Sequence, residues 1–145
     1  MNWNFKLLEK IMNNKKFQLD IITPNGSRMI GSVDYLRAPS IDGLFGIMAQ
    51  HIPAIIAINA GEIKVVVDGK ETFYATSGGY ADVKKEGVML VLETAERGDE
   101  IDIDRANKSI ERATQHLKDK TKDIERSKLA IEKAKVRIDI SKKLN

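Results

Sequence analysis

The sequence contains no cysteine, which excludes disulfide bonds, thiol catalysis and metal sites built on cysteine. No apolar run approaches the ~18 residues that a membrane-spanning helix needs. No glycine or proline follows Gly98, and no aromatic residue follows Tyr80. Residues 99–145 therefore lack the residues that interrupt helices and also the side chains that stack on nucleic-acid bases.

Residues that could act in catalysis are also scarce. His51 and His116 lie far apart in the sequence, and neither stands at ligand spacing from another histidine or a paired acid. Ser77-Gly78-Gly79 precedes a predicted strand, so it resembles neither a nucleophile elbow nor a phosphate loop, and we expect tight backbone packing there. The acids from Asp99 to Asp104 lack the spacing of a calcium loop and suit the start of a helix. The sequence predicts neither an enzyme nor a metal site.

Strand signals dominate the chain from Phe17 onward. Short β-branched or alternating apolar runs are separated by turn residues, most clearly at Pro24-Asn25-Gly26 and Asp68-Gly69. The predicted strands begin at Phe17 and continue as Arg28–Leu36 (bulged at Gly31), Ala54–Ile58 (buried), Ile63–Val67, Glu71–Thr76, Tyr80–Val83 and Val88–Leu92. Many short strands with turns at this spacing indicate an antiparallel β-sandwich or barrel.

A helical pattern replaces the strand pattern after Asp102, which occupies the position of a helix N-cap. The expected seam residues are Ile103, Ala106, Ile110, Ala113 and Leu117, then Ile124, Ser127, Ile131, Ala134 and Ile138. The polar break from Lys118 to Lys122 predicts two helices in an antiparallel hairpin. Because small seam residues bury little apolar surface, we expect a weakly held hairpin that can detach or open.

These patterns divide the chain into an N-terminal arm (1–16), a β-sandwich (17–98) and a two-helix domain (99–145). The arm is rich in Asn and Lys, predicts a short amphipathic helix without the features of a targeting signal, and is expected to be dispensable. The net charge of +3 falls entirely in residues 99–145, which carry 13 basic and 10 acidic side chains. A basic helical tail is typical of a solvated surface or of a protein that meets an acidic partner.

A cluster of charged residues at the junction is a candidate ligand site. Its members are Glu96, Asp102, Arg105, Arg112, Lys133 and Arg137. Arg105 and Arg112 lie two turns apart on one helical face, and Lys133 and Arg137 share a face of the second helix. If the hairpin folds back, the cluster suits a nucleotide, with cations for phosphates and carboxylate for base or ribose. The alternative is a set of surface ion pairs.

Four short motifs carry a family resemblance in their order and spacing. They are Gly43-x-Phe45-Gly46-Ile47, His51-x-Pro53, Ser77-Gly78-Gly79 and Glu93-Thr94-Ala95-Glu96-Arg97. Through them, the chain from Phe17 to its C-terminus resembles the epsilon subunit of bacterial and plastid F-type ATP synthases. The resemblance implies a ten-stranded sandwich followed by a helical hairpin. It also implies a non-catalytic rotor subunit that couples rotation of the c-subunit ring to the catalytic head.

The resemblance further implies three partners: the gamma subunit, the c-subunit ring and the alpha/beta catalytic head. In that family the hairpin rests on the sandwich or extends along the shaft, where it blocks ATP hydrolysis and its basic face meets acidic segments. The cations suited to that contact are Arg126, Lys128, Lys133 and Lys135. Ala49 replaces a usual proline and Leu44 an often polar residue, so we expect a more apolar contact with the c ring. The membrane is reached only through the complex, on the cytoplasmic face in bacteria or the stromal face of a thylakoid.

Residues Ile101-Asp102-x-x-Arg105-Ala106 resemble the ATP-binding motif of some bacterial members. The expected binding set is Glu96, Ile101, Asp102, Arg105, Ala106, Arg112, Lys133 and Arg137, with ATP as a regulatory ligand and no required cofactor. Lys133 stands where those members often carry arginine, and lysine lacks the planar bidentate fork, so we expect weaker affinity. The alternative is a free basic hairpin that binds nucleic acid or another acidic partner, and the absence of aromatic residues after Tyr80 argues against nucleic acid.

Overall fold

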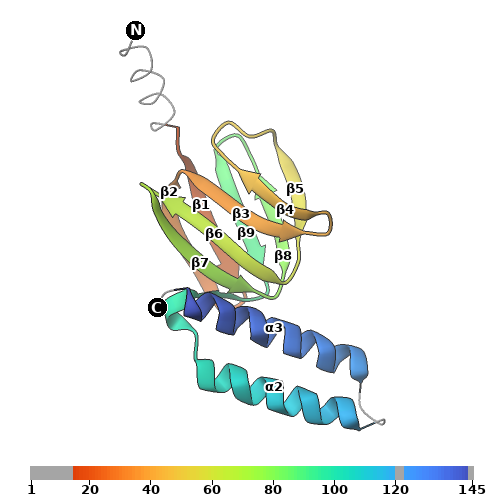
Figure 1. Ribbon diagram of the computed structural model, residues 1–145. Coiled ribbons are helices and arrows are strands. Elements are labelled where there is room, and N and C mark those ends of the chain that lie inside the picture. The colour runs from red at the N-terminus through yellow and green to blue at the C-terminus, as the bar shows by residue number, and fades with distance from the viewer. Residues whose placement is uncertain (1–14, 120–122, 144–145) are drawn as a thin grey trace.

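The computed structural model describes residues 15–119 and 123–143, which form a β-sandwich with a helical hairpin packed against one end of it (Figure 1). The strands are β1 (Phe17–Thr23), β2 (Gly26–Val33), β3 (Tyr35–Ser40), β4 (Gly43–Ile47), β5 (Ala54–Ile58), β6 (Gly61–Val67), β7 (Lys70–Thr76), β8 (Gly79–Val83), β9 (Gly87–Leu92) and β10 (Ala95–Arg97). A 3₁₀ turn, η1 (Gly98–Glu100), leads to helices α2 (Ile103–Lys118) and α3 (Ile124–Lys142). The predicted helix in the N-terminal arm and most of the polar link between the helices lie outside the described residues.

Ten strands form two five-stranded sheets, which confirms the predicted sandwich. Sheet A has the order β2-β1-β9-β8-β5, and sheet B has the order β10-β7-β6-β3-β4. Neighbouring strands are antiparallel except for β1 and β9, which run parallel in the middle of sheet A. The sequence did not predict this pair, because parallel neighbours are joined by a long crossover rather than by a turn.

The predicted strand Arg28–Leu36 is in fact two strands that belong to different sheets. The chain crosses from sheet A to sheet B at Asp34, and both Val33 and Leu36 are fully buried. An unbroken strand would place residues three apart on opposite faces, so the crossing lets both side chains reach one core. The bulge predicted at Gly31 is present, since the pairing of β1 with β2 shifts there and Gly31 has φ +94°.

Two further details of the sandwich differ from the sequence prediction. Strand β5 was expected to be buried, but it lies at the edge of sheet A and leaves Ile55 76% exposed. A short apolar run has the same sequence pattern in a fully buried strand and in a strand with one exposed face, so the pattern does not distinguish the two. Strands β4 and β10 were not predicted, because β4 contains two glycines and β10 has only three residues.

The close packing expected at Gly79 is present, since a Cβ there would lie 2.0 Å from the carbonyl oxygen of Val91.

The core of the sandwich is complete without the helices. Its fully buried side chains come from both sheets and include Leu19, Ile21, Leu36, Ile63 and Leu90. A separate small cluster of Ala75, Ile101 and Ile140 joins the hairpin to the sandwich. The two parts therefore have separate apolar interiors.

The hairpin has the predicted cap at Asp102 and a narrow seam, but Ile103 and Ile124, which were expected on that seam, are 37% and 43% exposed. Asp102 accepts a hydrogen bond from the backbone N–H of Arg105 at 3.0 Å, which caps α2. Asp123 caps α3 in the same way through Arg126 at 3.1 Å. The buried seam residues are Ala106, Ala113, Ser127 and Ala134. All four are small, so the helices approach closely but bury little apolar area.

Helix α3 carries the hairpin's main contacts with the sandwich, and these contacts lie at its C-terminal end. Figure 1 shows α3 between the sandwich and α2. Ile140 is fully buried against Ala75 and Ile101. Beyond it, the Lys143 ammonium pairs with Glu62 of β6 and lies 4.8 Å from the centre of the Phe73 ring. One small apolar contact, centred on Ile140 with Val136 beside it and polar contacts around it, therefore holds the hairpin in place.

We expect Ile140→Ala to release the hairpin while the sandwich stays folded. Removing a fully buried isoleucine side chain costs roughly 2–5 kcal/mol, so amide hydrogens of α3 should exchange at least about tenfold faster, with those of β8 and β9 unchanged. Ile124→Ala is the matched control, because Ile124 lies on the same helix but is 43% exposed. Equal exchange in the two variants would show that Ile140 is not the anchor.

Candidate functional site

A groove of about 1120 Å³ lies between the end of the sandwich and the inner face of the hairpin. Its walls are the β1–β2 turn, the link from β9 to β10, and the facing sides of α2 and α3. Its charged lining consists of Arg28, Glu93, Glu96, Arg105, Arg112, His116, Asp123, Arg126 and Arg137. Five arginines thus face three carboxylates, and the groove is basic without counting His116.

The regular spacing of α2 aligns much of this charge. Arg105, Ser109, Arg112 and His116 follow one another at intervals of four, three and four residues, which places them along one helical face. The seam residue Ala113 holds this face against α3. A small seam therefore brings a row of long basic side chains close to the second helix.

Arg137 joins α3 to the sandwich through Glu96 of β10. Its Nη2 donates a hydrogen bond of 2.9 Å to Oε2 of Glu96, and its Nε lies 2.8 Å from Oε1. Only the Nη2 contact is a hydrogen bond, so the two side chains form a close ion pair with one hydrogen bond rather than a bidentate fork. Both side chains are partly buried, so this pair is better shielded from solvent than a surface ion pair.

Arg28 ties the groove to the junction before α2. Its Nη2 lies 3.0 Å from Oε2 of Glu100 in η1, and its guanidinium lies 5.8 Å from the centre of the Tyr74 ring. Burial raises the pKa of the Tyr74 phenol, although the nearby Arg28 cation opposes this change. In the same junction, a hydrogen bond from Arg97 lowers the pKa of the Asp99 carboxyl. The short segment before α2 is thus fixed by charged contacts.

Three arginines of the groove are not neutralised in this way. The side chains of Arg105, Arg112 and Arg126 are exposed and form no ion pair or hydrogen bond within residues 15–119 and 123–143. Arg126 also lies in the first turn of α3, where the helix dipole favours negative charge. Unpaired cations converging on one groove favour a ligand with several negative charges.

The structure places the predicted site residues in several environments. Glu96, Arg105, Arg112 and Arg137 line the groove together. Asp102 serves as the cap of α2, and Ile101 and Ala106 are buried beside the groove rather than lining it. Lys133 lines a second hollow on another side of α3, together with Glu132 and Gly78.

Three basic residues of the groove were missed by the sequence reasoning. His116 is exposed and lines the groove. Its spacing of four residues from Arg112 could have identified it. Arg126 follows the cap Asp123 by three residues and could have been assigned to a helix N-terminus. Arg28 carries no such signal, because only the arrangement of the sheets brings it here.

The described residues offer little for other kinds of site. Among residues 15–119 and 123–143, no group of three or more His, Asp or Glu side chains is placed to hold a metal ion. The helices in this part of the chain are also too short or too polar to span a membrane. The groove is accordingly the candidate that the geometry favours.

Comparisons with known proteins agree with this architecture. A family model described as "ATP synthase, Delta/Epsilon chain, beta-sandwich domain" matches residues 16–98, and one described as "ATP synthase, Delta/Epsilon chain, long alpha-helix domain" matches residues 99–142. The ATP synthase epsilon chain of Nitratidesulfovibrio vulgaris (strain DP4) is 39% identical over 98 residues, which cover 68% of this chain and 73% of that relative. The ATP synthase epsilon chain of Carboxydothermus hydrogenoformans is 37% identical over 97 residues, covering 67% and 72%.

Two solved assemblies contain chains of similar fold. A chain in the mitochondrial ATP synthase of Euglena gracilis (OSCP/F1/c-ring) superimposes with a TM-score of 0.64 at 21% identity, covering 90% of this chain and 79% of that one. A chain in the central stalk and c-ring of the Tetrahymena thermophila mitochondrial ATP synthase gives 0.59 at 13% identity, covering 88% and 97%. At these identities the similarity concerns the fold.

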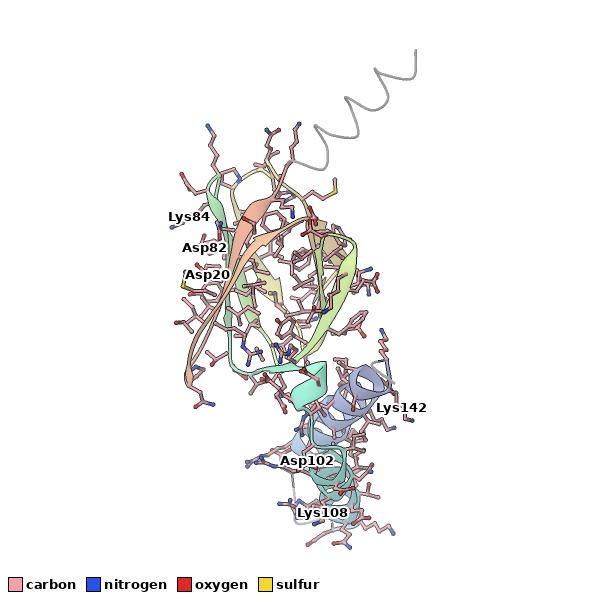
Figure 2. All side chains as sticks on the ribbon, turned by 90° about the vertical axis from the view of Figure 1, so that its left-hand side faces the viewer. Asp20, Asp82, Lys84, Asp102, Lys108 and Lys142 are labelled. Atoms are coloured by element: carbon pink, nitrogen blue, oxygen red, sulfur yellow. The ribbon has the colours of Figure 1, made fainter. Side chains whose placement is uncertain are left out.

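We expect the groove to bind inorganic tripolyphosphate, and Arg112→Gln to weaken that binding by about tenfold or more, because a hydrogen bond to a charged group contributes about 1.5–3 kcal/mol. Lys108→Gln removes the same charge from α2 outside the groove lining and should leave the affinity unchanged (Figure 2). Isothermal titration calorimetry at two salt concentrations measures both. Equal losses in the two variants would indicate non-specific attraction to a basic helix.

Proposed function

The chain belongs to the family of ATP synthase delta/epsilon chains, and from that premise we propose that it is a rotor subunit of the central stalk that restrains ATP hydrolysis through its hairpin. In this role it is not itself catalytic. It transmits rotation of the c-subunit ring to the catalytic head. It reaches the membrane only through the complex, on the cytoplasmic face of a bacterial membrane or the stromal face of a thylakoid.

The observation that carries the proposal is the separation of the two apolar interiors. The sandwich keeps its whole core when the hairpin leaves, and the hairpin is anchored chiefly through Ile140 at one end of α3. A rigid base suits transmission of torque, and a helix pair with one anchor suits release. The proposal therefore gives each part of the chain a separate task.

The sandwich presents separate apolar surfaces for two partners. Leu44 on β4, Met48 and Ile52 are 61–79% exposed, and we assign the surface around them to the c ring. The outer face of sheet A also exposes large apolar side chains, among them Met29 and Ile55, and we assign it to the gamma subunit. A subunit held on both surfaces would turn with the ring and the shaft.

The released hairpin is proposed to meet the alpha/beta catalytic head. Arg126, Lys128 and Lys135 of α3 are exposed, and they remain available to acidic segments when the helix extends. Because the excess positive charge of the chain lies in residues 99–145, attraction to an acidic surface favours the extended state. Contact with the head would then block rotation in the direction of hydrolysis.

ATP is proposed to oppose this release. The groove exists only while the hairpin is docked, since its walls come from both parts of the chain. A ligand that binds the docked state alone stabilises that state by mass action. Arg105, Arg112 and Arg126 would take the phosphates, and Glu96 would take a hydroxyl or amino group of the nucleoside. Binding of ATP would thus keep the inhibitory state depopulated.

Deleting residues 103–145 is expected to leave assembly intact and to raise the rate of ATP hydrolysis by the purified complex. The truncated sandwich retains both proposed partner surfaces but lacks the basic hairpin. Co-purification and steady-state hydrolysis measure the two parts of the proposal separately. Loss of the truncated chain from the complex contradicts the assignment of both surfaces to the sandwich, whereas unchanged hydrolysis contradicts the inhibitory role.

ATP is expected to hold the hairpin against the sandwich. Because the chain lacks cysteine, Lys70→Cys and Lys118→Cys give two unique labelling positions for fluorescence energy transfer, at exposed residues outside both proposed partner surfaces. In the assembled complex, saturating ATP should shift the transfer toward the value of the isolated, docked chain. Adding Arg105→Gln should remove this response. If ATP does not change the energy transfer in the labelled complex that retains Arg105, the proposed ATP response is contradicted.

A further inference from the structure

The outer face of sheet A carries one row of side chains that crosses all five strands. The strand register sets Ile55 beside Asp82, Asp82 beside Met89, Met89 beside Asp20, and Asp20 beside Met29. Figure 2 shows Asp20 and Asp82 on the same side of the sandwich, away from the helical hairpin. Two carboxylates therefore flank a central methionine, with an exposed apolar side chain at each end of the row.

This row has polar and small residues on one side, namely Gln18, Gly87 and Ser32, and mostly apolar residues on the other. The next row along the strands consists of Ala57, Tyr80, Val91, Ile22 and Ser27. Met29 is 81% exposed, Ile55 76% and Tyr80 43%. The inner face of the same sheet is also apolar, with Leu19 and Leu90 fully buried. A sheet that exposes several large apolar side chains on its outer face, over an apolar inner face, is typical of one that is covered on both sides.

The described part of this chain does not supply the cover. The hairpin packs against β6 and β7 of sheet B and against η1, at the end of the sandwich. Under the proposed function, the subunit that covers sheet A belongs to the central stalk of the same complex. An apolar cover would exclude water from whatever charges lie beneath it.

Asp20 is the charged side chain that such a cover would remove from water without a compensating charge. It is half-buried and forms no ion pair or hydrogen bond within the described residues. Asp82 differs, because the Lys84 ammonium lies 3.7 Å from its Oδ2. Removing an unpaired carboxylate from water is strongly unfavourable unless an opposite charge accompanies it.

We propose that Asp20 receives an arginine or lysine of the central-stalk subunit that covers sheet A. The apolar side chains around it form the seal, and the ion pair fixes the register of the two subunits. This inference rests on the proposed function, since it takes the covering partner from the same complex. It adds to the proposed function that the partner must place a basic side chain opposite Asp20.

Charge also decides against other occupants. A second copy of the chain paired face to face would bring its own Asp20 and Asp82 toward these two carboxylates, and like charges repel. An anionic lipid surface is disfavoured for the same reason. A basic side chain set in an apolar surface is the complement that remains.

The test measures the affinity of the full-length chain for a complex stripped of it, at low and at moderate salt. Asp20→Asn keeps the shape of the side chain but removes the charge, and it should weaken binding about 30-fold or more, because the partner's cation is then buried alone. Asp20→Glu should restore most of the affinity. Glu86→Gln, at the exposed β8–β9 turn, should have no effect.

The possible outcomes separate this inference from the proposed function. If the wild-type chain fails to bind the stripped complex, the proposed function fails. If the wild type binds and Asp20→Asn binds equally well, only the ion pair at Asp20 is overturned. Failure of Asp20→Glu to restore binding also overturns it, provided that circular dichroism melting shows both variants folded. Concentration-dependent dimers that Asp20→Asn strengthens would instead make the face a contact between copies.

Discussion

The burial of Ile140 against Ala75 and Ile101 is the contact on which the arrangement of the two parts depends. It fixes the C-terminal end of α3 to the sandwich and leaves the rest of the hairpin to stand away from it. The groove occupies the space that this tilt creates, so its size and its cations are consequences of where the anchor lies. The Glu96–Arg137 ion pair lines the groove and adds a second link between α3 and the sandwich.

Local signals in the sequence predicted the features that depend on neighbours along the chain. Asp102 caps α2 as expected, and the spacing of Ala106, Ala113 and Ala134 predicted the narrow seam. Features that depend on which strands become neighbours were not predictable in this way. The crossing at Asp34 and the parallel pair of β1 with β9 arise only when two sheets close over one core.

The same distinction holds for the site. Arg105 and Arg112 share a face of one helix, so their helical period predicted that they would lie together. Lys133 and Arg137 are four residues apart, which leaves about 40° of rotation between them on a helix of 3.6 residues per turn. That rotation is enough for α3 to direct them into different hollows. Arg28 reaches the groove from β2, and no local pattern in its own strand indicates this.

The interior position of β1 in sheet A, between β2 and β9, has a consequence for synthesis of the chain. Its two neighbours are β2, which follows at once, and β9, which ends at Leu92. During translation the β1–β2 hairpin would emerge with one long edge open, and that edge would remain unpaired until almost the whole sandwich had left the ribosome. Such edges are prone to aggregate, so this protein would be most exposed to misfolding during translation, before the last strands of the sandwich have emerged.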